Sequence, residues 1–281
     1  MTIVHAFDHF VVPVDDIVAA EDFYTRVFGG EIVKRNGLNV QHRKRGAIPH
    51  TFLKIGGKRV GVYLQSDDRP KPTGVRGAPT YSFTTTLKGI DETLKELRQL
   101  NVEHEGPIDN ARSFTVRSLY FNDLSGNHFE VYVPKEQKKT ETETMPGRMT
   151  SVGYLELEAP NVEASVRFYQ QVLGFELVGY SEDTHQNVRQ ATMKIPSGQI
   201  LFLTEVPFTP KGLVLIRTVP GPHIAFYIPP ERWEAALAHL DKLGIPNADR
   251  GAAKEPKPGR GGTYMDDPGG NVVQYITEGT E

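Results

Sequence analysis

The sequence repeats itself at an interval of about 145 residues. Three motifs of the first half return in order in the second: Phe23-Tyr24 as Phe168-Tyr169, VFGGE (27–31) as VLGFE (172–176), and SLYFNDLSGNHFEVY (118–132) as GTYMDDPGGNVVQY (262–275). Because the motifs agree in order and nearly in spacing, the chain is a tandem duplication. The two halves are therefore expected to adopt the same type of fold.

The hydrophobic pattern divides each half into two βαβββ units. In the first unit, strand 7–14 precedes a helix at 17–28, which Asp15 or Asp16 caps and Gly29-Gly30 ends. Its remaining strands are 31–36, 50–55 and 59–65, with Gly56-Gly57 as a hairpin turn. The second unit has a strand at 80–86, a helix at 90–100 and strands at 115–121 and 127–133.

These patterns predict an α+β fold with four βαβββ units that form two paired-sheet cradles. One unit curls but cannot close its own concave face, whereas two units side by side enclose a pocket. We predict an N-terminal module at 1–133 and a C-terminal module at 149–281. The charged segment 134–148, which has no hydrophobic period, is expected to link them.

Composition limits the classes of function. The net charge of −3 gives no reason to expect nucleic acid or an anionic membrane as a partner. The absence of cysteine excludes disulfides, thiolate metal ligands and a cysteine nucleophile. The first residues, MTIVHAFDHF, lack the pattern of a signal peptide, and no apolar run is long enough for a membrane span. We expect a cytoplasmic protein with a small-molecule substrate, as a monomer or a homo-oligomer.

Three segments resemble the vicinal oxygen chelate superfamily of glyoxalases, bleomycin-binding proteins and extradiol dioxygenases: DHFVVPVDD…AEDFYTRVFGGE, GPHIAFYIPPERWEAALAHLDKLGIP and GTYMDDPGGNVVQY. The resemblance extends over nearly all of the chain apart from the linker. It implies tandem glyoxalase/dioxygenase-like modules. It also implies a divalent metal held by residues on the first and last strands of paired units, which a substrate chelates through two neighbouring oxygens.

The resemblance places the ligand positions on these strands. The four first-strand positions hold His9, Thr80, Tyr154 and His223, and the last-strand positions of the second and fourth units hold Glu130 and Gln274. If each half closes on itself, the sites are His9/Thr80/Glu130 and Tyr154/His223/Gln274. If the first unit pairs with the fourth, they are His9/His223/Gln274 and Tyr154/Thr80/Glu130. The second arrangement is preferred, because it brings both histidines together.

Two histidines and an oxygen donor suit Fe(II), with Mn, Ni or Zn as alternatives. Gln274 offers a neutral amide oxygen where the dioxygenase pattern has a glutamate. Tyr264 lies ten residues before Gln274, the spacing at which the resemblance implies a tyrosine near the substrate oxygens. A phenol there can donate a hydrogen bond to an oxyanion. His185 and His128 are the candidates for a general base.

The first hypothesis is a metal-dependent enzyme that acts on a small substrate with vicinal oxygens. Extradiol-type ring cleavage of a catechol-like aromatic is the best interpretation. The alternative enzyme is an isomerase or lyase of the glyoxalase type, in which a metal stabilises an enediolate. A hypothesis of another class is a non-catalytic protein that binds a small molecule and has lost its metal.

Overall fold

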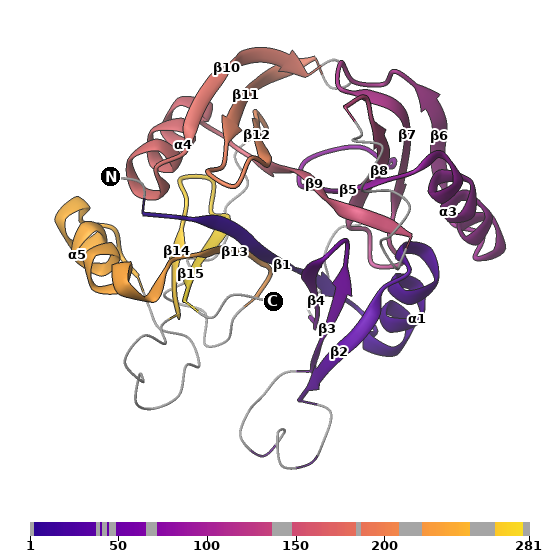
Figure 1. The fold of residues 1–281 in the computed structure, drawn as a ribbon, viewed down its shortest axis with the longest axis horizontal. Coiled ribbons are helices and arrows are strands. Elements are labelled where there is room, and N and C mark those ends of the chain that lie inside the picture. The colour runs from indigo at the N-terminus through magenta and orange to yellow at the C-terminus, as the bar shows by residue number, and fades with distance from the viewer. Residues whose placement is uncertain are drawn as a thin grey trace. The chain divides into compact units, whose positions relative to one another are not determined.

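The computed structural model describes residues 3–37, 40, 44, 49–65, 72–136, 148–183, 187–207, 221–247 and 262–277. In chain order its elements are β1 (Ala6–Val14), α1 (Ile17–Phe28), β2 (Glu31–Asn36), β3 (His50–Ile55), β4 (Lys58–Leu64), β5 (Thr80–Thr85), α3 (Leu87–Gln99), β6 (His104–Asp109), β7 (Thr115–Asn122), β8 (His128–Pro134), β9 (Met149–Glu158), α4 (Val162–Phe168), the π-helix η1 (Tyr169–Leu173), β10 (Glu176–Asp183), β11 (Val188–Lys194), β12 (Ile200–Thr204), β13 (His223–Tyr227), the 3₁₀-helix η3 (Pro230–Arg232), α5 (Trp233–Leu243), β14 (Gly262–Asp266) and β15 (Val272–Ile276) (Figure 1). The fold is mixed α+β, as predicted from the sequence.

The strands form two sheets. The seven-stranded sheet has the order β14-β15-β13-β1-β4-β3-β2, and the eight-stranded sheet has the order β10-β11-β12-β9-β5-β8-β7-β6. Contacts divide the chain into unit 1, Met1–Val11 with Glu156–Glu281, and unit 2, Val12–Leu155. Most of the linker predicted at 134–148 lies outside the described residues, so the module boundaries at 133 and 149 stay a prediction.

In unit 1, the first strand of the first repeat pairs with the first strand of the fourth. β1 runs antiparallel to β13, with His9 opposite Ala225 and Val11 opposite His223. β13 in turn runs parallel to β15, which pairs with β14. Figure 1 shows β1 beside β13, with β14 and β15 next to them. The prediction that the first repeat pairs with the fourth is confirmed.

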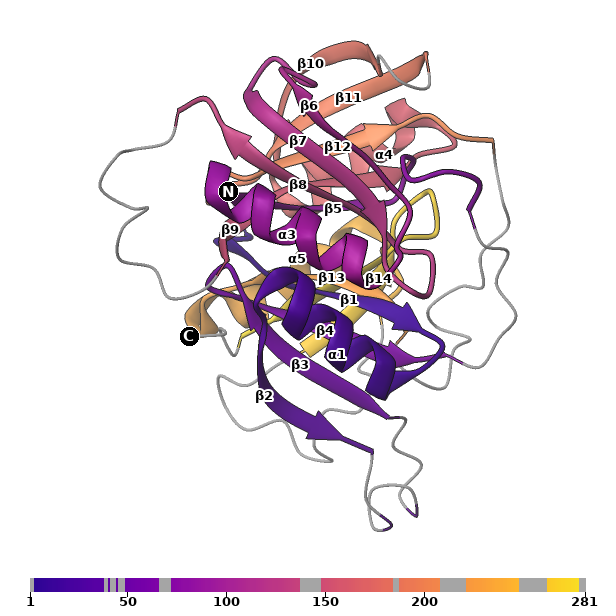
Figure 2. The ribbon, with the colours of Figure 1, turned by 90° about the vertical axis from the view of Figure 1, so that its right-hand side faces the viewer.

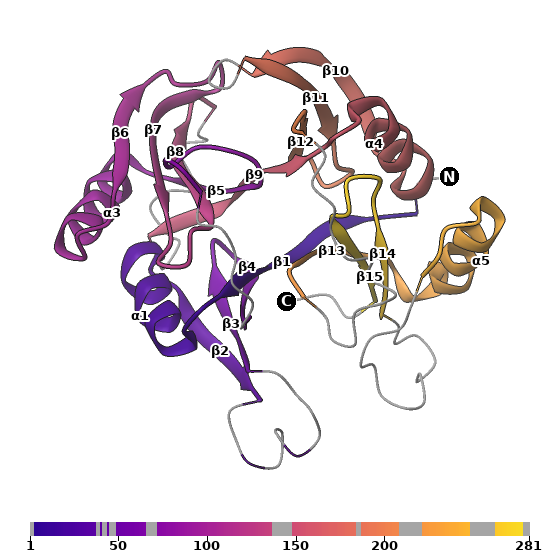
Figure 3. The same cartoon turned by 180° about the vertical axis from the view of Figure 1, so that it is seen from behind.

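In unit 2, the second repeat borders the third in the same manner. β5 lies between β8 and β9 in the eight-stranded sheet, as Figure 3 shows. The Ser82 hydroxyl on β5 accepts from the Tyr154 N–H on β9 at 2.7 Å and also contacts the Tyr154 carbonyl at 2.7 Å. β5 runs parallel to β8, with Ser82 opposite Glu130. The alternative, in which each half closes on itself, is wrong.

Local signals set the helix ends. The Asp16 carboxylate caps α1 by accepting from the Val18 and Ala19 N–H groups, and Gly29 ends the helix with a φ of 68°. Thr86 caps α3, which begins three residues before the predicted start at 90. In Figure 2, α1 and α3 lie side by side, and Arg26 of α1 pairs with Glu96 of α3 at 3.1 Å. No helix in the described part of the chain is long and apolar enough to cross a membrane.

The hydrophobic pattern of the sequence did not predict β6. β6 reads HEGPID, without alternating hydrophobicity and with a Gly-Pro pair that is unfavourable in a regular strand. It is tolerated because β6 is an edge strand whose pairing with β7 is irregular between Glu105 and Ile108. This strand completes the second βαβββ unit.

The repeated D-x-x-G-N motif forms the same buried turn in both units. Asp123 accepts hydrogen bonds from the Tyr24 hydroxyl at 2.9 Å and the Asn127 amide at 2.7 Å. Asp267 accepts from the Tyr169 hydroxyl at 3.1 Å and the Asn271 amide at 2.8 Å. Burial raises the pKa of both aspartates, although these hydrogen bonds oppose the shift. The repeated motif thus forms the same contact in both units, a hydrogen bond from a helix tyrosine to the aspartate of the turn.

Candidate metal centre

His9 and His223 meet on one face of the seven-stranded sheet. His9 is opposite Ala225, and His223 precedes Ala225 by two residues, so both imidazoles project to the same side. Their Nε2 atoms are 3.2 Å apart, and the ring planes are inclined at 78°. The side chains are buried, with exposed fractions of 3% and 8% for the two residues. Two residues that are 214 positions apart in the sequence are therefore in contact at one buried site.

Hydrogen bonds on the other ring nitrogens fix the tautomers that we assign. The Nδ1 atom of His9 lies 2.5 Å from Oδ1 of Asp8, and Nδ1 of His223 lies 2.7 Å from the Gly221 carbonyl oxygen. Because both oxygens act as acceptors, each Nδ1 carries the proton and each Nε2 presents a lone pair. Two lone pairs that face one another at this distance require a cation or a shared proton between them.

Gln274 and Tyr264 lie on the same face as the two histidines. Gln274 is opposite Ala225 on one side and opposite Tyr264 on the other. Its Oε1 atom is buried and has no hydrogen-bond partner among the described residues. The Tyr264 ring packs edge-on against His223, with centroids 5.3 Å apart. The face therefore combines two imidazole donors, one available amide oxygen and a phenol.

This donor set fits a divalent transition metal. An imidazole nitrogen binds such ions at about 2.0–2.1 Å, which places two nitrogen ligands about 2.8–3.4 Å apart at octahedral to tetrahedral angles. The observed 3.2 Å between the Nε2 atoms falls in this interval. No group of three or more His, Cys, Asp or Glu side chains in the described part of the chain is arranged to hold a metal. The buried Oε1 atom of Gln274, on the same face as the two imidazoles, is the candidate for a third donor.

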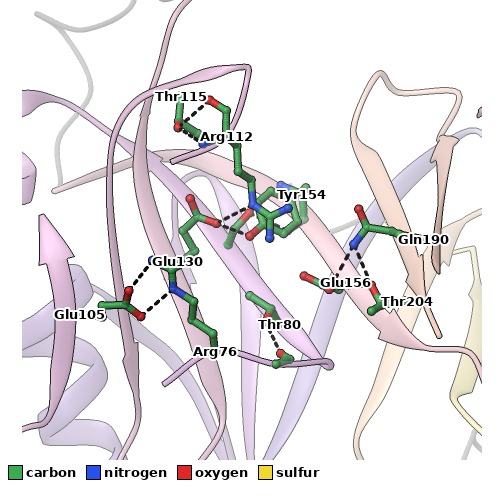
Figure 4. A network of polar contacts seen from close by, with 12 residues as sticks. Arg76, Thr80, Glu105, Arg112, Thr115, Glu130, Tyr154, Glu156, Gln190 and Thr204 are labelled. Carbon is green, nitrogen blue, oxygen red and sulfur yellow. Dashed lines mark hydrogen bonds and ion pairs between the residues drawn. The ribbon is translucent and has the colours of Figure 1, made fainter. Parts of the chain in front are cut away.

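The corresponding positions of unit 2 form a different centre, shown in Figure 4. Glu130 is opposite Tyr120 on β7 and Ser82 on β5, the register in which Gln274 is opposite Tyr264 and Ala225. Its carboxylate accepts from the Tyr154 hydroxyl and pairs with Nε of Arg112 at 3.3 Å. The Arg112 guanidinium also lies over the Tyr154 ring, 4.7 Å from the centroid. Glu130 is completely buried, so an arginine supplies the compensating charge here.

Thr80 and His128, which were also named from the sequence, belong to unit 2. Thr80 hydrogen-bonds to the Gly77 carbonyl at 2.5 Å in unit 2. His128 is buried on β8, on the face that Glu130 shares. His185 lies outside the described residues. The structure thus joins His9, His223, Gln274 and Tyr264 in one group and gives Glu130 to another.

Three polar groups were not found from the sequence. Asp8 was missed because strict alternation directs it away from His9. Arg112 was missed because it lies in a loop, between β6 and β7, that has no periodic signal. In unit 1, buried Glu156 accepts from the Thr204 hydroxyl at 2.6 Å and from the Gln190 amide at 3.3 Å (Figure 4). A bulge at Asp8, the loop that carries Arg112 and the pairing of distant strands produce these contacts.

A family model described as the glyoxalase/bleomycin resistance protein/dioxygenase superfamily matches residues 6–131 and 151–275, which is most of the chain. The protein belongs to this superfamily. The resemblance predicted from the motifs is thereby confirmed, and members of the superfamily are usually metal-dependent enzymes. No curated protein matches the chain.

Solved structures confirm the fold of this superfamily member. A candidate dioxygenase from Bacillus subtilis is 17% identical, with a TM-score of 0.72 over 99% of this chain and 87% of its own. Glyoxalase I from Zea mays is also 17% identical, with a TM-score of 0.65 over 97% of this chain and 92% of its own. At these identities the likeness concerns the fold and leaves the reaction open.

Proposed function

We propose that the protein is a metal-dependent enzyme that acts on a small substrate with two adjacent oxygens, at a centre formed by His9, His223 and Gln274. The observation that carries the proposal is the contact between the two Nε2 atoms at 3.2 Å, with both Nδ1 atoms directed to acceptors. The buried Oε1 atom of Gln274 supports it as the third donor. Glu130 is not included, because Arg112 engages its carboxylate.

A divalent metal held by these residues supplies Lewis acidity to two neighbouring substrate oxygens, and Fe(II) in addition supplies oxygen chemistry. The chain itself provides orientation and a closed environment. Asp8 and the Gly221 carbonyl hold the imidazoles in one tautomer. The Tyr264 phenol, on the same face, is placed to donate a hydrogen bond to a substrate oxyanion.

Extradiol ring cleavage of a catechol-like aromatic is the reaction that we favour. The position of Tyr264 beside His223 supports this interpretation, since a phenol next to the centre suits a substrate with two phenolic oxygens. Gln274 supports a second candidate, an isomerase or lyase of the glyoxalase type. A set of neutral donors would suit a non-redox metal, which would supply Lewis acidity to two neighbouring substrate oxygens.

The test begins with metal content. We expect the purified protein, reconstituted with Fe(II) without oxygen, to hold one metal per chain, and His9→Ala and His223→Ala to lose it. His5→Ala is the matched control, because His5 is an exposed histidine just before β1. Full metal content in both site variants would refute the site. Absence of metal from the wild-type protein would favour a small-molecule binding protein.

The reaction is tested on the metal-loaded protein. Oxygen consumption with a panel of substituted catechols, and loss of that consumption in Tyr264→Phe, would support ring cleavage. If the metal is bound but no catechol consumes oxygen, α-ketoaldehyde adducts of thiols are the substrates to try. Their isomerisation would establish the second candidate in place of the first.

A further inference from the structure

Asp8 occupies an irregular point in β1. Phe7 is opposite Phe226 and His9 is opposite Ala225, so Asp8 is the extra residue of a β-bulge. In a regular strand the side chains of Asp8 and His9 would point to opposite faces. A bulge redirects a side chain, and bulges are frequent beside functional sites. Here the Asp8 carboxylate reaches Nδ1 of His9 at 2.5 Å.

The contact between Asp8 and His9 lies in the protein interior, where both residues are buried. Asp8 has an exposed fraction of 2%, and a buried carboxylate is costly unless hydrogen bonds or an opposite charge compensate it. Its oxygen meets the one imidazole nitrogen that does not face His223. A carboxylate in this place fixes the ring orientation of His9 and keeps the proton on Nδ1, so that Nε2 remains a donor.

The charge of the centre gives Asp8 a second role. His9, His223 and Gln274 are neutral donors, so a divalent cation among them meets no formal negative charge. The Asp8 carboxylate contacts Nδ1 of His9 and therefore lies one imidazole ring away from such a cation. Electron density passed through the hydrogen bond raises the basicity of a ligand histidine.

We propose that Asp8 is the positioning residue of the metal centre: through its bulge it orients His9 and supplies, from behind the ring, the negative charge that Gln274 does not. This inference rests on the proposed function, since it requires a metal at His9 and His223. Asp8, the neighbour of the proposed ligand His9, would thus supply the negative charge that a carboxylate ligand supplies directly.

The experiment measures binding of Co²⁺ to the metal-free protein by competition with a chromophoric chelator, together with the visible ligand-field spectrum of bound Co²⁺. Asp8→Ala removes both the acceptor and the charge. Asp8→Asn is nearly isosteric and keeps an acceptor oxygen but no charge. Asp22→Asn, on the exposed face of α1, removes one charge away from β1 and is the matched control. Circular dichroism of each metal-free variant reports whether it is folded.

We expect the Co²⁺ dissociation constant of Asp8→Ala to rise about 10–100-fold, the range typical of lost partners to ligand histidines, with an altered spectrum. Asp8→Asn should give a smaller rise and a spectrum close to that of the wild type, and Asp22→Asn should give no change. Wild-type affinity in Asp8→Asn would overturn the charge contribution, and wild-type affinity and spectrum in both Asp8 variants would overturn the whole inference. If the wild-type protein itself binds no Co²⁺, the proposed function fails instead.

Discussion

Glu130 is the structural counterpart of Gln274. Each lies on the strand that runs parallel to the first strand of its repeat, and each is opposite a tyrosine on the neighbouring antiparallel strand. The carboxylate at one position is compensated by Arg112, whereas the amide at the other leaves its oxygen without a partner among the described residues. The duplicated chain therefore has one centre that Arg112 occupies, and the corresponding centre is the one for which we propose an external cation.

Replacing Arg112 tests this view of the second centre. Arg112→Ala should lower the free energy of unfolding by about 3 kcal/mol, because it leaves the buried Glu130 carboxylate without its counter-charge. Urea denaturation measures the loss. Adding Glu130→Gln to Arg112→Ala should recover part of it, since no buried charge then remains. If the single variant is as stable as the wild type, Arg112 does not neutralise Glu130.

A negative charge at Gln274 tests the third ligand. Gln274→Glu should tighten Co²⁺ binding about tenfold, equivalent to about 1.4 kcal/mol, because a carboxylate attracts a divalent ion more strongly than an amide does. Chelator competition measures the change. Gln171→Glu, at an exposed glutamine of unit 1, is the control that should leave the affinity unchanged. Equal affinity in wild type and Gln274→Glu would exclude residue 274 as a ligand.

The buried turns should contribute similarly to both units. Tyr24→Phe and Tyr169→Phe each remove one hydroxyl donor to a buried aspartate, and each should lower the free energy of unfolding by about 1 kcal/mol. Because the two networks share no residue, the losses in the double variant should add. Chemical denaturation checks both points. An unchanged stability in either single variant would show that the hydrogen bond from its hydroxyl does not stabilise the fold.

Acid should weaken unit 2 through Glu21. The hydrogen bond from Arg35, aided by one from Thr51, lowers the pKa of Glu21 although burial opposes the shift. A carboxyl group whose pKa is lower in the folded state stabilises the fold above its ordinary pKa of about 4.3, and the stabilisation is lost as the pH falls through the folded-state pKa. Glu21→Gln should therefore flatten the decline in stability between about pH 5 and pH 3. Urea midpoints across this range provide the measurement, and parallel curves for both proteins would contradict it.

The sequence by itself determined the duplication and most of the helices and strands, and the family resemblance named the positions for which ligands are proposed. Asp16 caps the start of α1, Gly29 terminates the helix, and Gly56-Gly57 forms the turn between β3 and β4. These signals can be read from the sequence because capping and turn geometry depend on a few neighbouring residues. Alternation of side chains within a strand was enough to place His223 on the face of Ala225. These features need no knowledge of distant parts of the chain.

Only the tertiary structure decided which repeats pair, and thereby which side chains meet. Periodicity within β1 cannot say that His9 joins His223 across 214 positions, because strand partners are selected by packing of the whole unit. Nor can it anticipate the bulge that redirects Asp8 or the loop that brings Arg112 to Glu130. Local sequence sets the direction of a side chain in a regular strand, whereas irregular backbone and long-range pairing determine what that side chain contacts.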